Sequence, residues 1–199
     1  MNELERLTIP ETDATAAVAA FRQRAAEEGL LDVAYADLDS PMGPLSVFVT
    51  PRGLVRLAYG EAVDELDELA ARLSPRIIAA PERTDAVRRE LEAYFAGERH
   101  GFDVPVDWSL VHGFAGAVLQ ATTRIPFGSV SSYRAVATDA GSPNAYRAAG
   151  NALGSNPVPI VVPCHRVLGA NGSLTGYAGG LHLKQKLLGI EKQSQLLFT

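Results

Sequence analysis

The sequence has one cysteine, Cys164, in 199 residues. A single cysteine cannot form a disulfide within the chain or build a cysteine-rich zinc site. The sequence also lacks an apolar run of roughly 18 residues, which excludes a membrane-spanning helix from the expected structure. Its first residues, MNELERLTIPETD, are polar and acidic. We therefore expect neither a secretory signal nor a transit peptide, and a protein of the cytoplasm.

Acidic residues are scarce in the second half of the chain. Residues 1–110 hold 11 Arg and Lys against 21 Asp and Glu, whereas residues 111–199 hold 7 against 2. The first part therefore carries a net charge of −10 and the second a net charge of +5. This asymmetry indicates two domains with different partners, and a basic domain is suited to a polyanion such as DNA. The alternative is a difference in surface composition that serves no partner.

The first half of the chain predicts a small sheet with helices. β-Branched and aromatic residues, separated by the turn sequences SPMGP and PRG, predict an antiparallel meander of strands at 33–38, 45–50 and 53–60. Helices are expected over residues 13–28, 61–73 and 82–96. Gly97 is expected to end the last of these helices.

The second half predicts a helix-turn-helix. After a helix over 113–123, Ser132 can cap a helix that ends at Gly141, and Ser142 with Pro143 can begin the next. Such helix pairs also occur in proteins that do not bind nucleic acid. A buried extended segment with three prolines (157–169), a glycine-rich loop (172–180) and an amphipathic helix (181–191) follow.

The expected fold class is α+β. We expect a helical extension over residues 1–32 and an α/β support domain with an antiparallel sheet over 33–110. Residues 111–199 are expected to form a mostly helical domain with a winged helix-turn-helix.

Cys164 lies between Pro163 and His165 at the end of an apolar run. Most free cysteines are small buried hydrophobic residues, and that interpretation stays open. Three neighbouring features favour a nucleophile instead. A histidine can assist deprotonation of a thiol, prolines make the backbone rigid, and the glycine-rich loop lets backbone approach a ligand closely.

Two strings at this position, NPVPIVVPCHRV (156–167) and GSLTGYAGG (172–180), resemble the active-site signature of the O6-alkylguanine-DNA alkyltransferases, also called methylated-DNA–protein-cysteine methyltransferases. The resemblance covers residues 111–191. It extends more weakly over 33–110 through SPMGPL, GLVRLAYG and LEAYFAGE, and residues 1–32 lie outside it.

The resemblance implies direct and irreversible repair of O6-alkylguanine, and possible substrates include O4-alkylthymine. Cys164 resembles the nucleophile that accepts the alkyl group and keeps it as a thioether. His165 resembles the base that takes the thiol proton through a water, and Glu191, as the last residue of the closing helix, resembles the carboxylate that orients this histidine. On an extended segment, neighbouring side chains point to opposite faces, which leaves room for such a water. Asn156 resembles the asparagine that braces the turn beneath the cysteine, although a simple Asn-Pro turn is an alternative.

The resemblance also implies residues for DNA. Arg147 resembles the arginine finger that enters the base stack, and Tyr133 resembles the tyrosine that helps to flip the nucleotide. Tyr177 and the backbone of Ala178 resemble the pocket wall and the amide donor near O6, and the backbone of Val167 would meet the exocyclic amine of guanine. Small residues, Gly150 among them, keep the second helix slim enough for the minor groove or, alternatively, for close helix packing.

The sequence departs from the family at two points. Some members bind zinc through cysteines of the N-terminal domain, and this chain has none there, so we expect no metal and no cofactor. Tyr146 stands where the family often has a small residue.

The expected protein is a monomer that acts on double-stranded DNA and not at a membrane. Two alternatives remain at this point, namely a helix-turn-helix module without catalysis and a cysteine hydrolase built on Cys164, His165 and Glu191.

Overall fold

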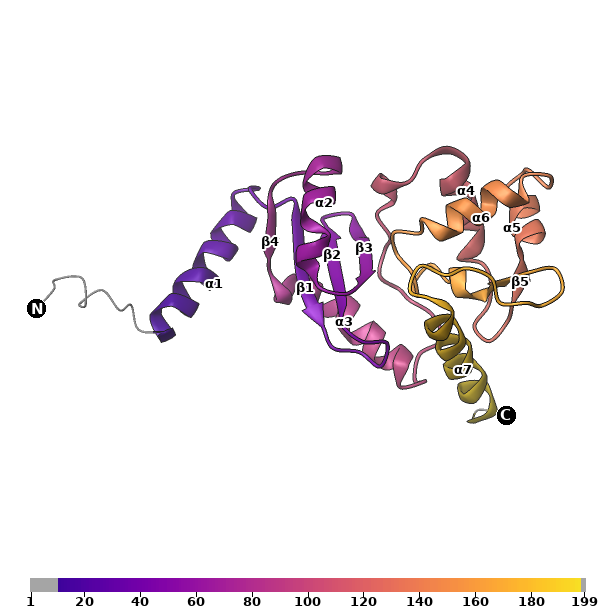
Figure 1. Cartoon of the computed structure of the whole chain (residues 1–199). Coiled ribbons are helices and arrows are strands. Elements are labelled where there is room, and N and C mark those ends of the chain that lie inside the picture. Colours follow the sequence, from indigo (N-terminus) through magenta and orange to yellow (C-terminus); the bar gives the residue numbers. More distant parts are fainter. Residues whose placement is uncertain (1–10, 198–199) are drawn as a thin grey trace, which may run out of the picture.

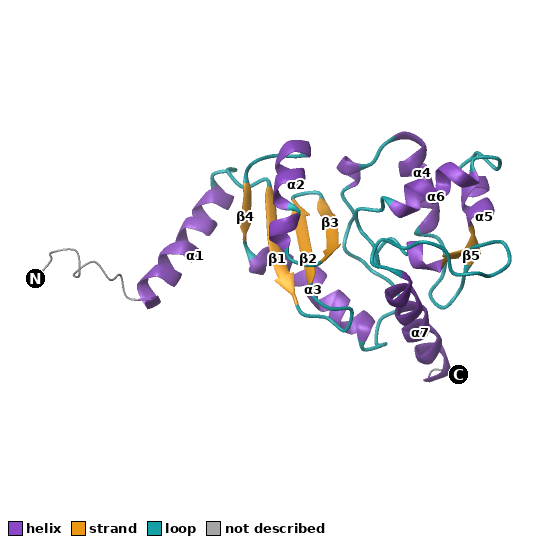
Figure 2. Ribbon diagram, in the orientation of Figure 1, coloured by secondary structure: helices purple, strands orange, loops and turns teal. Residues whose placement is uncertain are grey.

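The computed structural model describes residues 11–197. Figures 1 and 2 show a sheet with helices beside a mostly helical part, and helix α1 (Glu11–Glu27), which extends away from the sheet. The predicted helical extension covers residues 1–32, and its residues 1–10 lie outside the described part. Within that described part, no helix has both the length and the apolar character to span a membrane.

The first part contains a mixed four-stranded sheet in the order β3-β2-β1-β4. Strands β1 (Val33–Leu38), β2 (Leu45–Thr50) and β3 (Gly53–Tyr59) form the predicted antiparallel meander. The fourth strand, β4 (Ile77–Ala79), pairs with β1 in parallel. The prediction of a purely antiparallel sheet is therefore wrong, because a three-residue strand carries too short a pattern to be recognised.

Two helices cover opposite faces of this sheet. Strand residues alternate between the faces, and Val33, Phe48 and Val55 pack with Leu69 of α2 (Leu66–Arg72). On the other face, Ala34 and Val47 share a cluster with Leu91 and Tyr94 of α3 (Pro81–Phe95). Gly97, at φ 76°, follows α3 as expected. The single helix expected over 61–73 is a 3₁₀ turn, Ala62–Asp64, followed by α2.

The second part is built from four helices. These are α4 (Gly113–Thr122), α5 (Tyr133–Asp139), α6 (Tyr146–Gly154) and α7 (Leu181–Leu197). Helices α4, α5 and α6 pack against one another. A short parallel pair, β5 (Ser131–Ser132) with β6 (Val167–Leu168), joins the start of α5 to the segment that follows Cys164. The α+β fold class, with its helical second part, is confirmed.

Three helix boundaries test the sequence prediction. Ser132 caps α5 as predicted, because its hydroxyl accepts from the Ala135 N–H at 3.2 Å. Ser142 does not cap α6. Its N–H bonds to the Ala137 carbonyl at 2.8 Å at the end of α5, and its carbonyl accepts from the Ala145 N–H at 2.9 Å, which closes a turn before α6 begins at Tyr146. Helix α7 continues to Leu197, six residues beyond the predicted end at Glu191.

The larger hydrophobic cluster crosses from one part of the molecule to the other. It contains Leu57 and Leu91 from the first part together with Val118, Val158 and Leu187 from the second. Cys164 belongs to the same cluster. The chemistry predicted around this thiol therefore lies where the two parts meet.

Candidate functional site

The segment before Cys164 is a series of tight turns. The Val162 N–H bonds to the Val158 carbonyl at 2.9 Å and the Cys164 N–H bonds to the Val162 carbonyl at 2.8 Å, before a 3₁₀ turn over Cys164–Arg166. Ile160 takes φ 73°. The prediction of an extended segment is wrong, although the predicted burial is confirmed for Val158, Ile160 and Val162. Because the segment is not extended, the opposite-face argument for a relay water no longer applies.

Asn156 contacts both the turn and the thiol. Its Oδ1 accepts from the Val158 N–H at 3.0 Å, and its Nδ2 donates to the Val162 carbonyl at 2.8 Å. The same Nδ2 lies 3.2 Å from Cys164 Sγ. Asn156 is thus at once a turn residue and a donor to sulfur, so the two interpretations of this residue are compatible.

The thiol of Cys164 is buried, with 6% of the residue exposed. Burial raises its pKa to about 11, against the opposing hydrogen bond from Asn156. At neutral pH this sulfur is therefore a thiol. Since the thiolate is the nucleophilic form, reaction at Cys164 requires a base close by.

His165 and Glu191 form a buried pair. His165 Nε2 lies 2.9 Å from Glu191 Oε1, and both side chains are at most 1% exposed. Burial opposes the charge of Glu191, but the hydrogen bonds from His165 and Arg166 outweigh it and lower the pKa of Glu191 to about 2. A carboxylate only accepts hydrogen bonds, so Nε2 carries the proton of a neutral His165 ring. Burial lowers the pKa of His165, which favours that neutral form.

The other ring nitrogen of His165 is the basic one. Nδ1 is buried and makes no hydrogen bond within residues 11–197. In the tautomer fixed by Glu191, Nδ1 carries a lone pair and no proton. The pair therefore presents a base next in sequence to the thiol.

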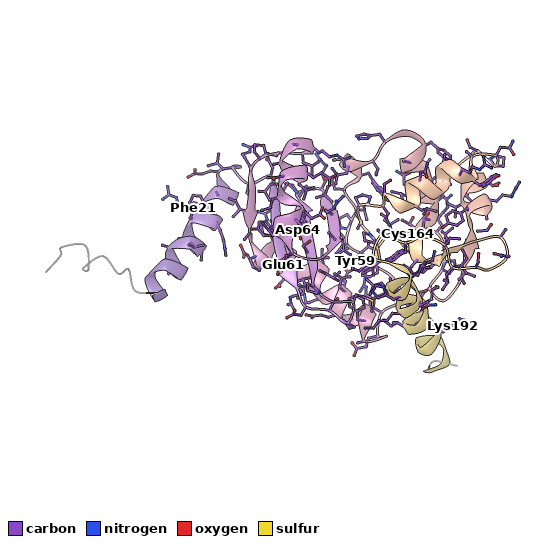
Figure 3. All side chains as sticks on the ribbon, in the orientation of Figure 1. Phe21, Tyr59, Glu61, Asp64, Cys164 and Lys192 are labelled. Carbon is purple, nitrogen blue, oxygen red and sulfur yellow. The ribbon has the colours of Figure 1, made fainter. Side chains whose placement is uncertain are left out.

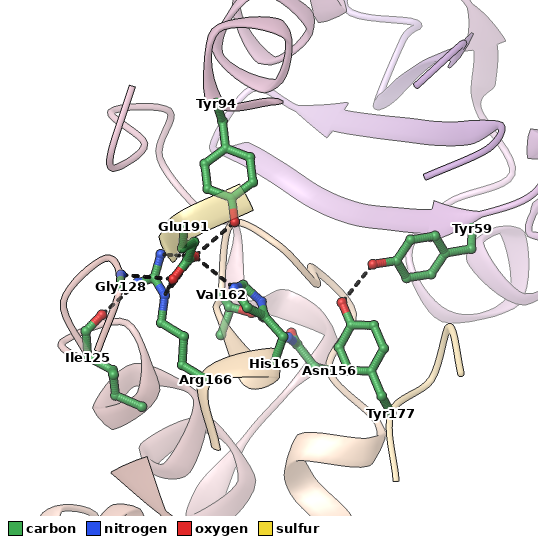
Figure 4. A network of polar contacts seen from close by, with 10 residues as sticks. All are labelled: Tyr59, Tyr94, Ile125, Gly128, Asn156, Val162, His165, Arg166, Tyr177 and Glu191. Carbon is green, nitrogen blue, oxygen red and sulfur yellow. Dashed lines mark hydrogen bonds and ion pairs between the residues drawn. The ribbon is translucent and has the colours of Figure 1, made fainter. Parts of the chain in front are cut away.

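Sequence reasoning missed three donors to Glu191 (Figure 4). Arg166 donates through Nε and Nη2 to Oε1 at 3.1 and 2.8 Å, and its Nη1 bonds to the Ile125 carbonyl at 2.6 Å. The Tyr94 hydroxyl donates to Oε1 at 2.9 Å, and the Gly128 N–H donates to Oε2 at 2.9 Å. Arg166 stands in the PCHRV string, but nothing local marks Tyr94, which lies 97 residues from Glu191.

The residues predicted for DNA lie in two environments. Arg147 is exposed on α6, with its guanidinium 5.8 Å from the centre of the Tyr146 ring. Tyr133, at the start of α5, is half-buried, and its hydroxyl pairs with Thr175 Oγ1 at 2.6 Å. Gly150 faces the Tyr133 ring, and a Cβ at Gly150 would lie 3.7 Å from that ring. Tyr133, Gly150 and the 172–180 loop are therefore together, while Arg147 lies on the outer surface.

The remaining predicted residues line the segments around the thiol. Ala178 is exposed on the glycine-rich loop, and the neighbouring Tyr177 pairs through its hydroxyl with Tyr59 at 2.6 Å. The Val167 carbonyl accepts from Lys184 Nζ at 2.6 Å. Lys184 was not predicted; it is fully buried, and this burial lowers its pKa. A carbonyl oxygen has two lone pairs, so Val167 retains one for a further donor.

Two family models match the chain. The model for the 6-O-methylguanine DNA methyltransferase DNA-binding domain matches residues 113–193. The model for the ribonuclease-like domain of 6-O-methylguanine DNA methyltransferase matches residues 33–108. The two matches together span most of the chain.

Curated relatives and solved structures agree with these matches. The inducible methylated-DNA–protein-cysteine methyltransferase of Bacillus subtilis is 40% identical over 148 residues, 73% of this chain and 82% of that protein. The methylated-DNA–protein-cysteine methyltransferase of Mycolicibacterium paratuberculosis is 41% identical over 163 residues, 81% of this chain and 93% of that protein. The structure of Mycobacterium tuberculosis OGT in complex with DNA matches with a TM-score of 0.70 at 39% identity, over 81% of this chain and 94% of that one.

Proposed function

The chain belongs to the 6-O-methylguanine DNA methyltransferase family, and from that premise we propose that it takes the alkyl group of an O6-alkylated guanine in duplex DNA onto Cys164. Its activity is DNA repair by alkyl transfer to a protein cysteine. The observation that carries the proposal is that the chain has one cysteine. That cysteine adjoins a neutral histidine held by a buried carboxylate.

The proposed reaction is a displacement at the alkyl carbon. The thiol proton passes through a water to Nδ1 of His165, and the sulfur attacks the carbon in line with the bond to O6. The carbon–sulfur bond forms as the carbon–O6 bond breaks, and the electron pair leaves on guanine, which then takes up a proton. Glu191 stabilises the imidazolium that forms on His165. A thioether is a poor leaving group, so each protein molecule reacts once.

The burial of Cys164 supports a mechanism in which the substrate base swings out of the DNA duplex. A sulfur that is nearly inaccessible cannot reach O6 inside a base stack, so the damaged nucleotide must be extruded. We assign the extrusion to Arg147, which is exposed on α6 in the basic half of the chain, and to Tyr133, which lies against the loop. A side chain that fills the gap offsets part of the cost of unstacking.

The proposed protein is a monomer that works in the cytoplasm. The nucleophile, its base and the carboxylate that holds the base are all complete within one chain, so the proposed chemistry requires no second copy. O4-Alkylthymine is a second possible substrate, because its alkyl group is also carried on an exocyclic oxygen. We propose no metal and no cofactor for the transfer, since the nucleophile and the base are both side chains of the protein.

Intact mass after mixing with duplex DNA that carries one O6-methylguanine tests the proposal. The wild-type protein should gain one methyl group, about 14 Da, on the peptide that contains Cys164, and Cys164→Ser should gain nothing. DNA binding without any mass change would identify a binding module instead. Release of the alkyl group to water, with unmodified protein, would identify a hydrolase.

A further inference from the structure

Strand β3 of the first part contacts both segments that flank the thiol. The Leu57 N–H bonds to the Pro157 carbonyl at 2.9 Å, in the turn that contains Asn156. Two residues further along the strand, the Tyr59 hydroxyl pairs with the Tyr177 hydroxyl at 2.6 Å, in the glycine-rich loop. Figure 3 places Tyr59 on the side of the sheet toward Cys164, and Figure 4 shows the pair of phenols beside Asn156. One strand thus holds two walls of the site.

The ring of Tyr59 fits against bare backbone at Gly179. A Cβ at Gly179 would lie 2.8 Å from a Tyr59 ring carbon and 2.8 Å from Leu183 Cδ1, closer than such atoms approach. The rings of Tyr59 and Tyr177 meet edge to face, with their centres 6.0 Å apart. The loop is therefore fixed by Tyr59 at two points, the hydroxyl of Tyr177 and the backbone of Gly179.

The phenol pair remains neutral in this setting. Both tyrosines are partly buried, and burial raises the pKa of each above its ordinary value. The contact is therefore a hydrogen bond between two neutral hydroxyls. It orients the loop without placing a charge near the sulfur.

We propose that Tyr59 is a positioning residue that sets the distance between the 172–180 loop and Cys164, and with it the size of alkyl group that the site aligns. This inference deepens the proposed function and rests on it. A methyl group makes few contacts of its own, so its alignment with the Cys164 sulfur depends on the position of the 172–180 loop. A benzyl group makes a larger contact surface and depends less on the loop. The first part of the chain would then determine selectivity as well as support the fold.

The test compares two duplexes of one sequence, one with O6-methylguanine and one with O6-benzylguanine. The ratio of the two alkyl-transfer rates removes the contribution of DNA binding, because both duplexes bind through the same sequence. Tyr59→Phe keeps the ring against Gly179 and removes the hydroxyl. We expect methyl transfer to slow by about two- to tenfold, the effect of one neutral hydrogen bond, with benzyl transfer nearly unchanged. The benzyl-to-methyl ratio should rise accordingly.

Two further variants make the test specific. Tyr177→Phe should raise the ratio as Tyr59→Phe does, and the double variant should raise it no further, because both changes remove one hydrogen bond. The matched control is Tyr35→Phe on β1, whose ring stacks on Phe48 in the cluster on the other face of the sheet. It should leave the ratio unchanged. An unchanged ratio in folded Tyr59→Phe, or additive effects in the double variant, would overturn the inference. Wild-type protein that accepts neither group would instead refute the proposed function.

Discussion

Cys164, His165 and Glu191 are buried at the junction of the two parts, whereas Arg147 is exposed on α6 of the same helical part. Five donors hold the carboxylate of Glu191 through four residues, including Tyr94 from the first part. Arg147 contacts an exposed neighbouring ring through its guanidinium. The reacting group is therefore preorganised in the absence of DNA, whereas the proposed finger stands on the surface, where a duplex can reach it. Substitutions at the buried residues should slow the reaction with every substrate. Substitution of Arg147 should slow only the reaction with duplex DNA, in which a base has to be unstacked.

Replacement of His165 should give the largest effect on either side of this comparison. His165→Ala removes the base that follows Cys164 in the sequence, and burial keeps the Cys164 thiol protonated. Loss of a general base typically costs about 10²- to 10⁴-fold in rate. Single-turnover rates should fall by similar factors with duplex DNA and with free O6-benzylguanine.

Two control variants distinguish loss of the base from a loss of folded protein. His165→Gln fills a similar volume without a titratable nitrogen and should behave as His165→Ala does. His112→Ala changes an exposed histidine at the start of α4 and should react at the wild-type rate. A wild-type rate in either His165 variant would remove the residue from the mechanism.

Arg147→Ala should affect the reaction with duplex DNA and the reaction with free O6-benzylguanine differently. Loss of a side chain that fills the gap in the stack should slow repair of duplex substrate by about one to three orders of magnitude. Reaction with free O6-benzylguanine should hardly change, since no stack has to be opened. An arginine that merely contacts phosphate would instead give a small loss, seen mainly as a changed salt dependence.

The measurement uses both substrates at two salt concentrations. Arg24→Ala, on α1 with a side chain that is 77% exposed, is the matched control and should leave both rates unchanged. Equal losses on duplex and free base in Arg147→Ala would show that Arg147 supports the pocket or the fold, contrary to the finger role.

Glu191 should contribute to stability above moderately acidic pH. Its pKa in the folded protein is about 2, below that of an ordinary glutamate, so the unfolded chain binds the proton more tightly. The contribution is complete above pH 4.5 or so and is lost as pH falls toward 2. The size of the shift corresponds to on the order of 3 kcal/mol.

Urea unfolding at neutral pH and in acid checks this prediction with Glu191→Gln. The wild-type advantage in free energy of unfolding should shrink as pH falls toward 2. Glu92→Gln on α3, whose side chain is 59% exposed, should cost little at any pH, as exposed ion pairs do. The same Glu191→Gln protein should transfer alkyl groups more slowly than wild type but faster than His165→Ala. An unchanged pH dependence would contradict the buried, charged state of Glu191.

The sequence was sufficient to predict those elements whose pattern lies within a few neighbouring residues. The strands predicted at 33–38, 45–50 and 53–60 follow from β-branched and aromatic residues between turn sequences, and the cap at Ser132 follows from its residue type. Three residues have no such signal: Tyr59, Tyr94 and Gly128 meet their partners across 118, 97 and 63 residues of chain. Ser142 is not the cap because its carbonyl closes a separate turn with the Ala145 N–H before α6 begins. The contribution of the first part to the site therefore became visible only in the folded structure.

A count of the methyl groups transferred in the presence of excess substrate tests the single-turnover reaction of Cys164. Wild-type protein is incubated with a tenfold excess of duplex DNA that carries labelled O6-methylguanine, and the transferred label is followed to its plateau. We expect one methyl group per chain, located on Cys164, because the chain has one cysteine and the thioether formed on it is a poor leaving group, so the thiol is not regenerated. Transfer that continues beyond one equivalent, or label on another residue, would contradict it.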